Sequence, residues 1–170
     1  LTDLTPESAQ QLRTYRVVHR RIAAATNERT LISAIVPPNT ACEVNATVAL
    51  ITGSEEQALK PFLCALLNSL VLDYVLRYKV ATTLNMFYMY QLPIPRLTPG
   101  DPHFDAIVPR AARLTCTRAE FADLWREVMG GAWDDSSGAT DPAERQRLRD
   151  EIDAIVAHLY GLSRADFDHI

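Results

Sequence analysis

Short apolar runs alternate with polar turns over the first third of the chain. Three of these runs, residues 15–22, 31–36 and 44–51, are rich in the β-branched or aromatic side chains that favour strands. The second run ends at Pro37 and Pro38, which cannot continue a ladder of backbone hydrogen bonds. The pattern therefore predicts three strands that form a small mixed or antiparallel sheet.

The period of the pattern changes over residues 61–80, where apolar residues recur at spacings of three and four. Such spacing predicts one long amphipathic helix with a broad buried face. Pro61 suits the first turn of this helix, and Arg77 and Lys79 in its last turn lie near the negative end of the helix dipole. The aromatic run at residues 86–90 then predicts a further strand.

A stretch with Pro and Gly at residues 96–103 divides the chain. We expect an α+β domain over residues 1–97, with the sheet packed on the long amphipathic helix, and a helical C-terminal subdomain over residues 98–170. In the second part the pattern predicts one helix that starts at Pro109 or just before it. A capping box at residues 117–120 predicts the start of the next helix.

The two remaining predicted helices have well-marked ends. One helix is predicted to start at Pro142, with Asp141 as its N-cap. Its apolar stripe runs over residues 148–159, and Gly161 follows the stripe and ends the helix. Residues 163–166 would cap one more short helix at the end of the sequence. Taken together, these elements predict the fold class α+β.

Composition is that of an ordinary globular protein, with 48% apolar and 22% charged residues among 170, which excludes wholesale disorder. The odd number of cysteines in apolar contexts predicts buried thiols in a reducing compartment, at Cys42, Cys64 and Cys116. The longest apolar run, residues 62–72, is too short to span a membrane, and we find no signal-peptide pattern. We therefore expect a cytoplasmic protein without a membrane partner. Because the sequence starts at Leu1 rather than Met, we also expect a fragment of a longer chain.

Charge is unevenly distributed along the sequence. The formal net charge is −4, but residues 1–99 carry +2 and residues 100–170 carry −6. Within seventeen residues Glu28 is the only acidic side chain among five arginines, Arg13, Arg16, Arg20, Arg21 and Arg29. A chain with a locally basic face and an acidic appendix can still bind nucleic acid, so the net charge does not exclude a DNA partner.

Motifs of catalytic sites are not found. The sequence has no Gly-rich phosphate loop and no Gly-x-Ser-x-Gly, and the spacings of its His, Cys and Asp residues match no common metal site. Four histidines are scattered along the chain, at His19, His103, His158 and His169. The Asp134-Asp135 pair lies in a Ser- and Gly-containing stretch that is typical of a solvated turn. We therefore expect no catalytic residue, no metal ligand and no cofactor site within these residues.

Polar side chains at predicted strand and helix ends are the remaining candidates for function. Arginine binds phosphate or guanine, asparagine binds adenine, and threonine contacts phosphate or the thymine methyl group. The candidate DNA-binding residues are Arg16, Arg20, Arg21, Thr26, Asn27, Arg29, Arg77, Lys79, Thr82, Thr83 and Asn85. The alternative is that the arginines and threonines are ordinary surface residues of strands and that Arg77 and Lys79 only cap a helix. Basic clusters alone are weak evidence of DNA binding.

Three stretches extend this picture: RRIAAATNERTLISAIVPP at 20–38, LLNSLVLDYVLRYKVATTLNMFYMYQLPIP at 66–95 and EIDAIVAHLYGLSRADFDHI at 151–170. They resemble the C-terminal target recognition region of bacterial restriction-modification DNA adenine methyltransferases of the type IIG kind. That region is similar to the recognition domains of type I specificity subunits. In this family a Leu-Asn-Ser helix that ends in Arg, a Thr-rich turn, a strand and a Leu-Pro-x-Pro exit build the recognition domain. The resemblance covers about residues 13–170.

The resemblance implies that these residues recognise a sequence in duplex DNA. An N-terminal catalytic domain of the same chain, outside these residues, would flip the adenine and methylate it from S-adenosylmethionine, and some members also cleave DNA. The catalytic Asn/Asp-Pro-Pro-aromatic motif of the family is not matched, because Pro37 and Pro38 stand between Val36 and Asn39. No catalytic residue is therefore carried over. The helical residues 104–170 would face away from the DNA.

A second interpretation makes the chain a protein–protein interaction or assembly module of a multidomain bacterial protein. It rests on the amphipathic stripes at residues 121–128 and 148–159, which are either docking surfaces or core. A free-standing enzyme is a third interpretation, and the failed motif tests speak against it.

Overall fold

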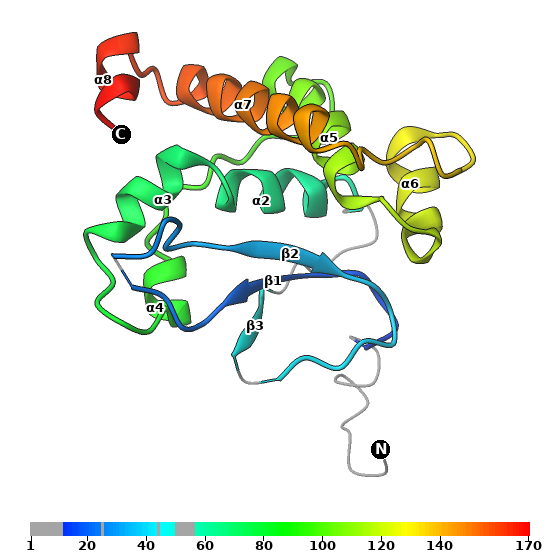
Figure 1. Ribbon diagram of the computed structural model, residues 1–170, viewed down its shortest axis with the longest axis horizontal. Coiled ribbons are helices and arrows are strands. Elements are labelled where there is room, and N and C mark those ends of the chain that lie inside the picture. Colours follow the sequence, from blue (N-terminus) through cyan, green and yellow to red (C-terminus); the bar gives the residue numbers. More distant parts are fainter. Residues whose placement is uncertain (1–11, 25, 44, 50–56) are drawn as a thin grey trace.

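The apolar runs of the first third form a three-stranded antiparallel sheet, as predicted (Figure 1). The computed structural model describes residues 12–24, 26–43, 45–49 and 57–170. The strands are β1 (Arg16–Arg20), β2 (Ser33–Val36) and β3 (Ala46–Ala49), in the spatial order β2-β1-β3. Residues 44, 50 and 51 of the third predicted strand lie outside the described residues.

One face of the sheet packs on helix α2 (Leu59–Leu67). Val17 lies opposite Ile35 and His19 lies opposite Ser33, so these four side chains share a face, and all four are buried. Buried residues of α2, among them Leu66, pack in the same hydrophobic core as Val17 and Ile35. The sheet and α2 thus form the first two layers of the fold.

The predicted long helix over residues 61–80 is wrong, because the chain forms two helices there. Helix α2 ends at Leu67, α3 spans Leu70–Arg77, and the two helices are bent by 54°. Ser69 is the N-cap of α3, and its hydroxyl oxygen accepts a hydrogen bond from the Leu72 N–H at 3.4 Å. A serine cap supplies an acceptor that a continuous helix would not need, so it marks the break.

The predicted strand at residues 86–90 is also wrong, since these residues form the one-turn helix α4 (Met86–Met89). Asn85 is its N-cap, and the side-chain oxygen of Asn85 accepts from the Phe87 N–H at 3.1 Å. The local cap therefore prevails over the strand preference of the aromatic residues.

Two predicted helix starts in the second part need correction. Helix α5 (Pro102–Thr115) begins at Pro102, behind its N-cap Asp101, and it contains Pro109 in its interior. No capping box forms at residues 117–120. A short 3-10 helix, η1 (Ala119–Phe121), follows Arg118 without a side-chain cap and leads into α6 (Ala122–Met129).

The last two helices are confirmed with their predicted caps. Helix α7 spans Pro142–Leu159, and the Asp141 carboxylate accepts from the Glu144 N–H at 2.8 Å. Gly161 follows with φ +67°, a left-handed conformation that favours glycine. Helix α8 (Arg164–His169) has the capping box between Ser163 and Asp166.

Helices α5 and α7 form a third layer over α2 (Figure 1). One hydrophobic core runs from Leu31 beside the sheet, through Leu66, to Ile107 and Val156 in the third layer. The predicted boundary between residues 1–97 and 98–170 is therefore a change in composition and not a break in the core.

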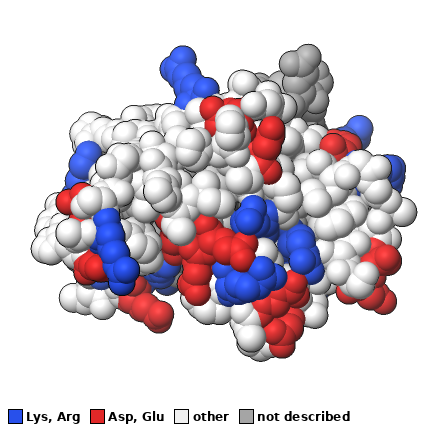
Figure 2. All heavy atoms as spheres, turned by 90° about the horizontal axis from the view of Figure 1, so that it is seen from above, with Lys and Arg blue, Asp and Glu red and all other residues white. Residues whose placement is uncertain are grey.

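Acidic and basic side chains are interleaved on the outer face of this third layer (Figure 2). Arg110 pairs with Glu151 at 2.7 Å, and Arg113 pairs with Glu144 at 2.7 Å. Much of the negative charge of residues 100–170 is thus balanced locally, although such exposed pairs add little to stability.

The described residues contain no single helix that is long and apolar enough to cross a membrane. Helices α2 and α3 reach that length and hydropathy only as a bent pair, and most of their apolar side chains are buried in the core. All three cysteines are free thiols, and Cys64 and Cys116 are buried as predicted, whereas Cys42 is half-buried. Burial raises the pKa of the Cys64 and Cys116 thiols to about 12.

Candidate nucleic-acid interface

Two segments that are distant in the sequence lie side by side at one end of the fold. The connection between β1 and β2 meets the segment that follows α3 (Figure 1). The Ala23 N–H donates to the Thr82 carbonyl oxygen at 3.0 Å, and the Leu84 N–H donates to the Arg21 carbonyl oxygen at 2.7 Å. We call the candidate residues that these bonds bring together the loop surface: Arg20, Arg21, Thr26, Asn27, Arg29, Arg77, Lys79, Thr82, Thr83 and Asn85.

Several side chains of the loop surface are open to solvent. The exposed ones are Thr26, Lys79, Thr82, Thr83 and Asn85, and Arg21 is half-buried. Neither Arg21 nor Lys79 forms an ion pair with any residue that the structure describes. These two cations and the threonine hydroxyls are therefore able to contact a partner without first giving up an internal ion pair.

Arg20 and Asn27 hold each other in place within the loop. The Arg20 Nη2 atom donates to the Arg29 carbonyl oxygen at 3.0 Å. With its amide oxygen turned toward Arg20, Asn27 accepts from the same Nη2 at 3.1 Å. These bonds use neutral acceptors, so the positive charge of Arg20 is not cancelled.

Arg29 and Arg77 are partly neutralised by carboxylates. The Arg29 Nη2 atom lies 3.8 Å from the Asp153 carboxylate on α7, in the acidic second part of the chain. Arg77 lies 2.9 Å from the carboxylate of Asp73 and also donates to the Glu28 carbonyl oxygen at 2.7 Å. Both arginines therefore support the fold of the loop surface, which reduces what they offer to a partner.

Arg16 was predicted to bind DNA together with the other arginines, but it does not belong to the loop surface. It lies at the opposite end of β1 from Arg20, it is 8% exposed, and its guanidinium donates to the Thr40 carbonyl oxygen. Arg16 and Arg20 share a face of β1 but lie at its two ends, so closeness in sequence did not bring these side chains together.

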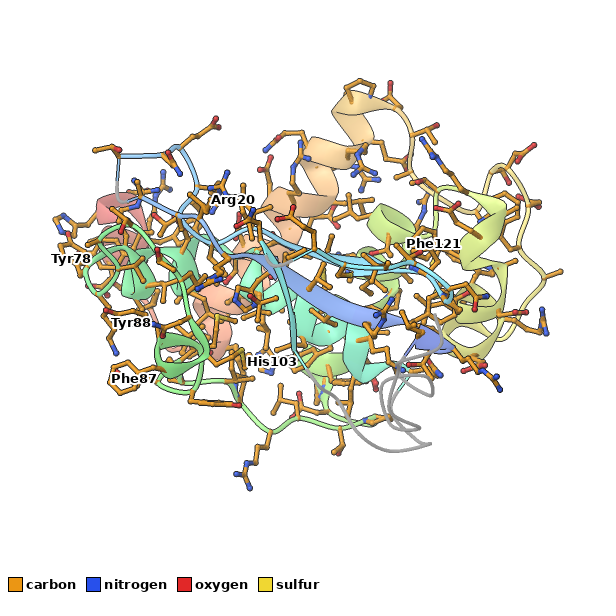
Figure 3. The ribbon with its side chains drawn as sticks, turned by 90° about the horizontal axis from the view of Figure 1, so that it is seen from below. Arg20, Tyr78, Phe87, Tyr88, His103 and Phe121 are labelled. Atoms are coloured by element: carbon orange, nitrogen blue, oxygen red, sulfur yellow. The ribbon has the colours of Figure 1, made fainter. Side chains whose placement is uncertain are left out.

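The structure also reveals exposed apolar side chains that the sequence reasoning missed. Tyr78, Phe87 and Tyr90 are 75%, 67% and 79% exposed, and Ile22 is 61% exposed. Figure 3 shows Tyr78, Phe87 and Tyr88 at the same end of the molecule. The signal was present in the run of five apolar residues after Asn85, which is more than a one-turn helix can bury.

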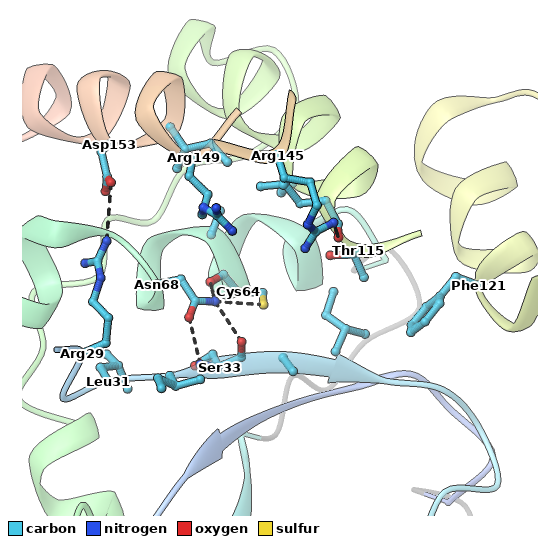
Figure 4. Close-up of a pocket in the computed structure, with 17 residues that line it drawn as sticks. Arg29, Leu31, Ser33, Cys64, Asn68, Thr115, Phe121, Arg145, Arg149 and Asp153 are labelled. Atoms are coloured by element: carbon cyan, nitrogen blue, oxygen red, sulfur yellow. Dashed lines mark hydrogen bonds and ion pairs between the residues drawn. The ribbon is translucent and has the colours of Figure 1, made fainter. Parts of the chain in front are cut away.

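The Leu-Asn-Ser segment and Asp73 anchor the loop surface to the helices. The Asn68 side chain hydrogen-bonds to the backbone of Ser33 (Figure 4). The buried carboxylate of Asp73 accepts from the Leu31 N–H at 2.7 Å. Asp153 accepts from the Leu70 N–H at 2.7 Å, while burial raises the pKa of its carboxyl. The residues that carry the resemblance most specifically thus act as structural supports of the candidate surface.

His19 is a buried titratable group next to the sheet face. It is 1% exposed, and burial lowers its pKa, while a hydrogen bond with the Leu84 backbone opposes that shift. Burial therefore disfavours the charged form of this imidazole.

Clusters of titratable side chains were sought among the described residues. The part of the chain that the structure describes holds no group of three or more His, Cys, Asp or Glu side chains placed to bind a metal ion. Asp134 lies in a turn, where it accepts from the Ser136 N–H at 2.8 Å, and bonds from Ser136 and Ser137 lower its pKa.

Comparison of the sequence with models of protein families and with curated proteins, and of the structure with solved structures, found no match. The similarity of residues 66–95 to methyltransferase recognition domains therefore stays a hypothesis.

Proposed function

We propose that these residues form the target recognition part of a restriction-modification DNA methyltransferase and bind duplex DNA through the loop surface. The backbone pairing of Ala23 with Thr82 and of Leu84 with Arg21 carries this proposal. It joins two segments that are rich in Arg, Lys, Thr and Asn into one surface.

The chemistry of the exposed groups suits a DNA duplex. Arg21 and Lys79 would bind phosphates, which account for half or more of protein–DNA hydrogen bonds. The hydroxyls of Thr26, Thr82 and Thr83 would contact phosphates or base edges. Tyr78, beside Lys79, would add an aromatic ring that packs against sugar or base.

Local charge favours the proposal despite the net charge of −4. The loop surface has five cations, and three carboxylates lie among them, Glu28, Asp73 and Asp153. The remaining acidic residues of the second part lie mostly on α5, α6, α7 and α8, where several pair with arginines. A positive local field is sufficient to attract DNA at low salt.

Methyl transfer would be the work of a catalytic domain outside these residues. That domain would bind S-adenosylmethionine and the flipped adenine, and it would contact the present chain as its partner within one protein. No step of that reaction is assigned to a residue of this chain. An enzyme of this kind acts on cellular DNA, so the proposal places it in the cytoplasm.

Binding to DNA can be measured directly with the 170-residue chain. Fluorescence anisotropy with a random-sequence duplex should show an affinity that falls steeply as salt rises from about 50 to 200 mM. Selection from a random duplex library should then enrich one short sequence, because base contacts specify and phosphate contacts do not. Binding without salt dependence, or a library that stays random after selection, would contradict target recognition.

A second candidate is a module for protein–protein assembly. The stripes at 121–128 and 148–159 do not favour it, because Leu124, Leu148 and Ile152 are buried in the core. The exposed rings of Tyr78 and Phe87 do favour it, since exposed apolar side chains that gather at one end can mark an interface. Light scattering would support assembly if the chain is a dimer that Tyr78→Ser with Phe87→Ser dissociates.

A further inference from the structure

A cavity of about 420 Å³ lies between β2, α2, α5 and α7, apart from the exposed part of the loop surface (Figure 4). This volume is within the range of small-molecule sites. Its apolar lining includes Ile35 of β2, Cys64 and Ala65 of α2, and Ile152 of α7. The cavity therefore offers an apolar floor for the body of a small ligand.

Arginines border this floor from two sides. Arg145 and Arg149 lie one turn apart on α7, and Figure 4 shows both side chains directed into the space between α7 and the sheet. Arg29 borders the cavity from the segment before β2. Three cations thus line one cavity, against a single carboxylate, that of Asp153.

The arginines of α7 differ in how they are paired. Arg147 does not line the cavity and lies 2.7 Å from Glu151. Arg145 donates to two carbonyl oxygens, of Leu114 and Ala139, and Arg149 donates to the Gln146 side chain. Among the described residues, neither Arg145 nor Arg149 has a carboxylate within ion-pair distance, so the cations of the cavity outnumber its one carboxylate, Asp153.

Two buried polar atoms of the lining have no partner among the described residues. These are the Ser33 hydroxyl, on a residue that is 9% exposed, and Nη1 of Arg29. Buried polar groups in folded proteins are nearly always hydrogen-bonded. An anion with an additional acceptor would satisfy such donors.

We propose that this cavity binds a small amphipathic carboxylate, with the carboxylate held by Arg145 and Arg149 and the apolar body resting on Cys64, Ala65 and Ile152. The single carboxylate of the lining does not fill this role, because Asp153 already accepts from the Leu70 N–H at 2.7 Å and lies 3.8 Å from Arg29. This site does not depend on the DNA proposal, because the cavity lies beneath α7 and the carboxylate is held by Arg145 and Arg149, which are not part of the loop surface; Arg29 borders both.

Calorimetry on the 170-residue chain tests the site with benzoate as the probe. Benzoate should bind with a dissociation constant on the order of 1 mM or tighter, as expected for a ligand of this size. Benzyl alcohol, of similar shape but neutral, should bind at least about tenfold more weakly because it lacks the charge. Chemical-shift changes should centre on Ser33, Cys64 and Ile152.

Paired variants on α7 separate the site from general charge effects. Arg149→Gln should weaken benzoate binding about tenfold or more, whereas Arg147→Gln removes the same charge from the outer face and should change it less than about twofold. Both positions are exposed, so both variants are expected to fold, which thermal unfolding would verify. Equal binding of benzoate and benzyl alcohol, equal binding of inorganic phosphate, equal effects of the two variants, or no binding at all would each overturn the proposal.

Discussion

The side-chain amide of Asn68 binds both backbone polar groups of Ser33. Its Nδ2 donates to the Ser33 carbonyl oxygen at 2.9 Å, and its Oδ1 accepts from the Ser33 N–H at 3.0 Å (Figure 4). Because β2 is an edge strand, these groups would otherwise be open to pairing with another chain. One amide at the break between α2 and α3 thus takes the place of a neighbouring strand and fixes the start of β2.

Replacing Asn68 should therefore destabilise the fold by more than is usual for a polar side chain that is only half-buried. Asn68→Ala leaves the Ser33 groups without partners and should lower the free energy of unfolding by about 2–4 kcal/mol. Asn68→Asp should cost about as much, because an oxygen would replace the donor that faces the carbonyl oxygens of Ser33 and Cys64. Chemical denaturation measures both changes.

The matched control is Asn45→Ala, since the Asn45 side chain is exposed and, within the part of the chain that is described, bonds to Glu43 alone. It should change the free energy of unfolding by less than about 0.5 kcal/mol. An Asn68→Ala variant as stable as this control would show that the amide does not support β2.

Arg77 and Lys79 lie two residues apart and should behave differently when replaced. Arg77→Gln removes the ion pair to the buried Asp73 carboxylate and should lower the free energy of unfolding by about 1–3 kcal/mol, allowing for the partial exposure of Arg77. Lys79→Gln should leave stability within about 0.5 kcal/mol and should instead weaken DNA binding. Denaturation and anisotropy on both variants test the pair, and a stability loss in Lys79→Gln alone would contradict these roles.

Stability should fall in mild acid because of His19. Burial lowers the pKa of His19 in the folded chain, so at a pH well above 6.5 the imidazole is neutral in both states and adds no pH dependence. As the pH falls through about 6.5 the unfolded chain takes up a proton that the buried side chain does not, and the free energy of unfolding decreases.

Denaturation at about pH 7.5 and about pH 5.5 measures this slope. His19→Leu should reduce the difference between the two values whatever its effect on overall stability. His158→Gln, at an exposed position on α7, should leave the difference unchanged. An unchanged difference in His19→Leu would exclude His19 as the source.

Two helices that begin at a local cap could be predicted from the sequence, α7 and α8. The caps at Asp141 and Ser163 depend on residues within one turn, and both form as expected. The break at Asn68 was missed because the apolar period continues across it from Leu66 to Val71. At this break Asn68 contacts Ser33, which lies in another element, so the apolar period alone does not indicate it.

The residue types of the candidate site could be predicted from the sequence, but which of its side chains are free and which are paired within the fold could not. The two segments could be named because Arg, Thr and Asn gather in them, and the structure brings the segments together. Which cations are free could not be read from the sequence, because the partner of Arg29 is Asp153 on the last long helix. Arg16 was misplaced for a similar reason, since only the strand geometry sets the two ends of β1 apart.

Two double variants that remove equal charge test the loop surface most directly. Arg21→Gln with Lys79→Gln acts on its free cations, and Arg118→Gln with Arg126→Gln acts on exposed arginines at η1 and α6, at the other end of the molecule. Anisotropy with duplex DNA at several salt concentrations should show that the first pair lowers affinity about tenfold or more and reduces the salt slope by about 2, while the second pair changes affinity less than about twofold. Equal effects of the two pairs would mean that the chain responds only to net charge, and would contradict recognition of DNA by the loop surface.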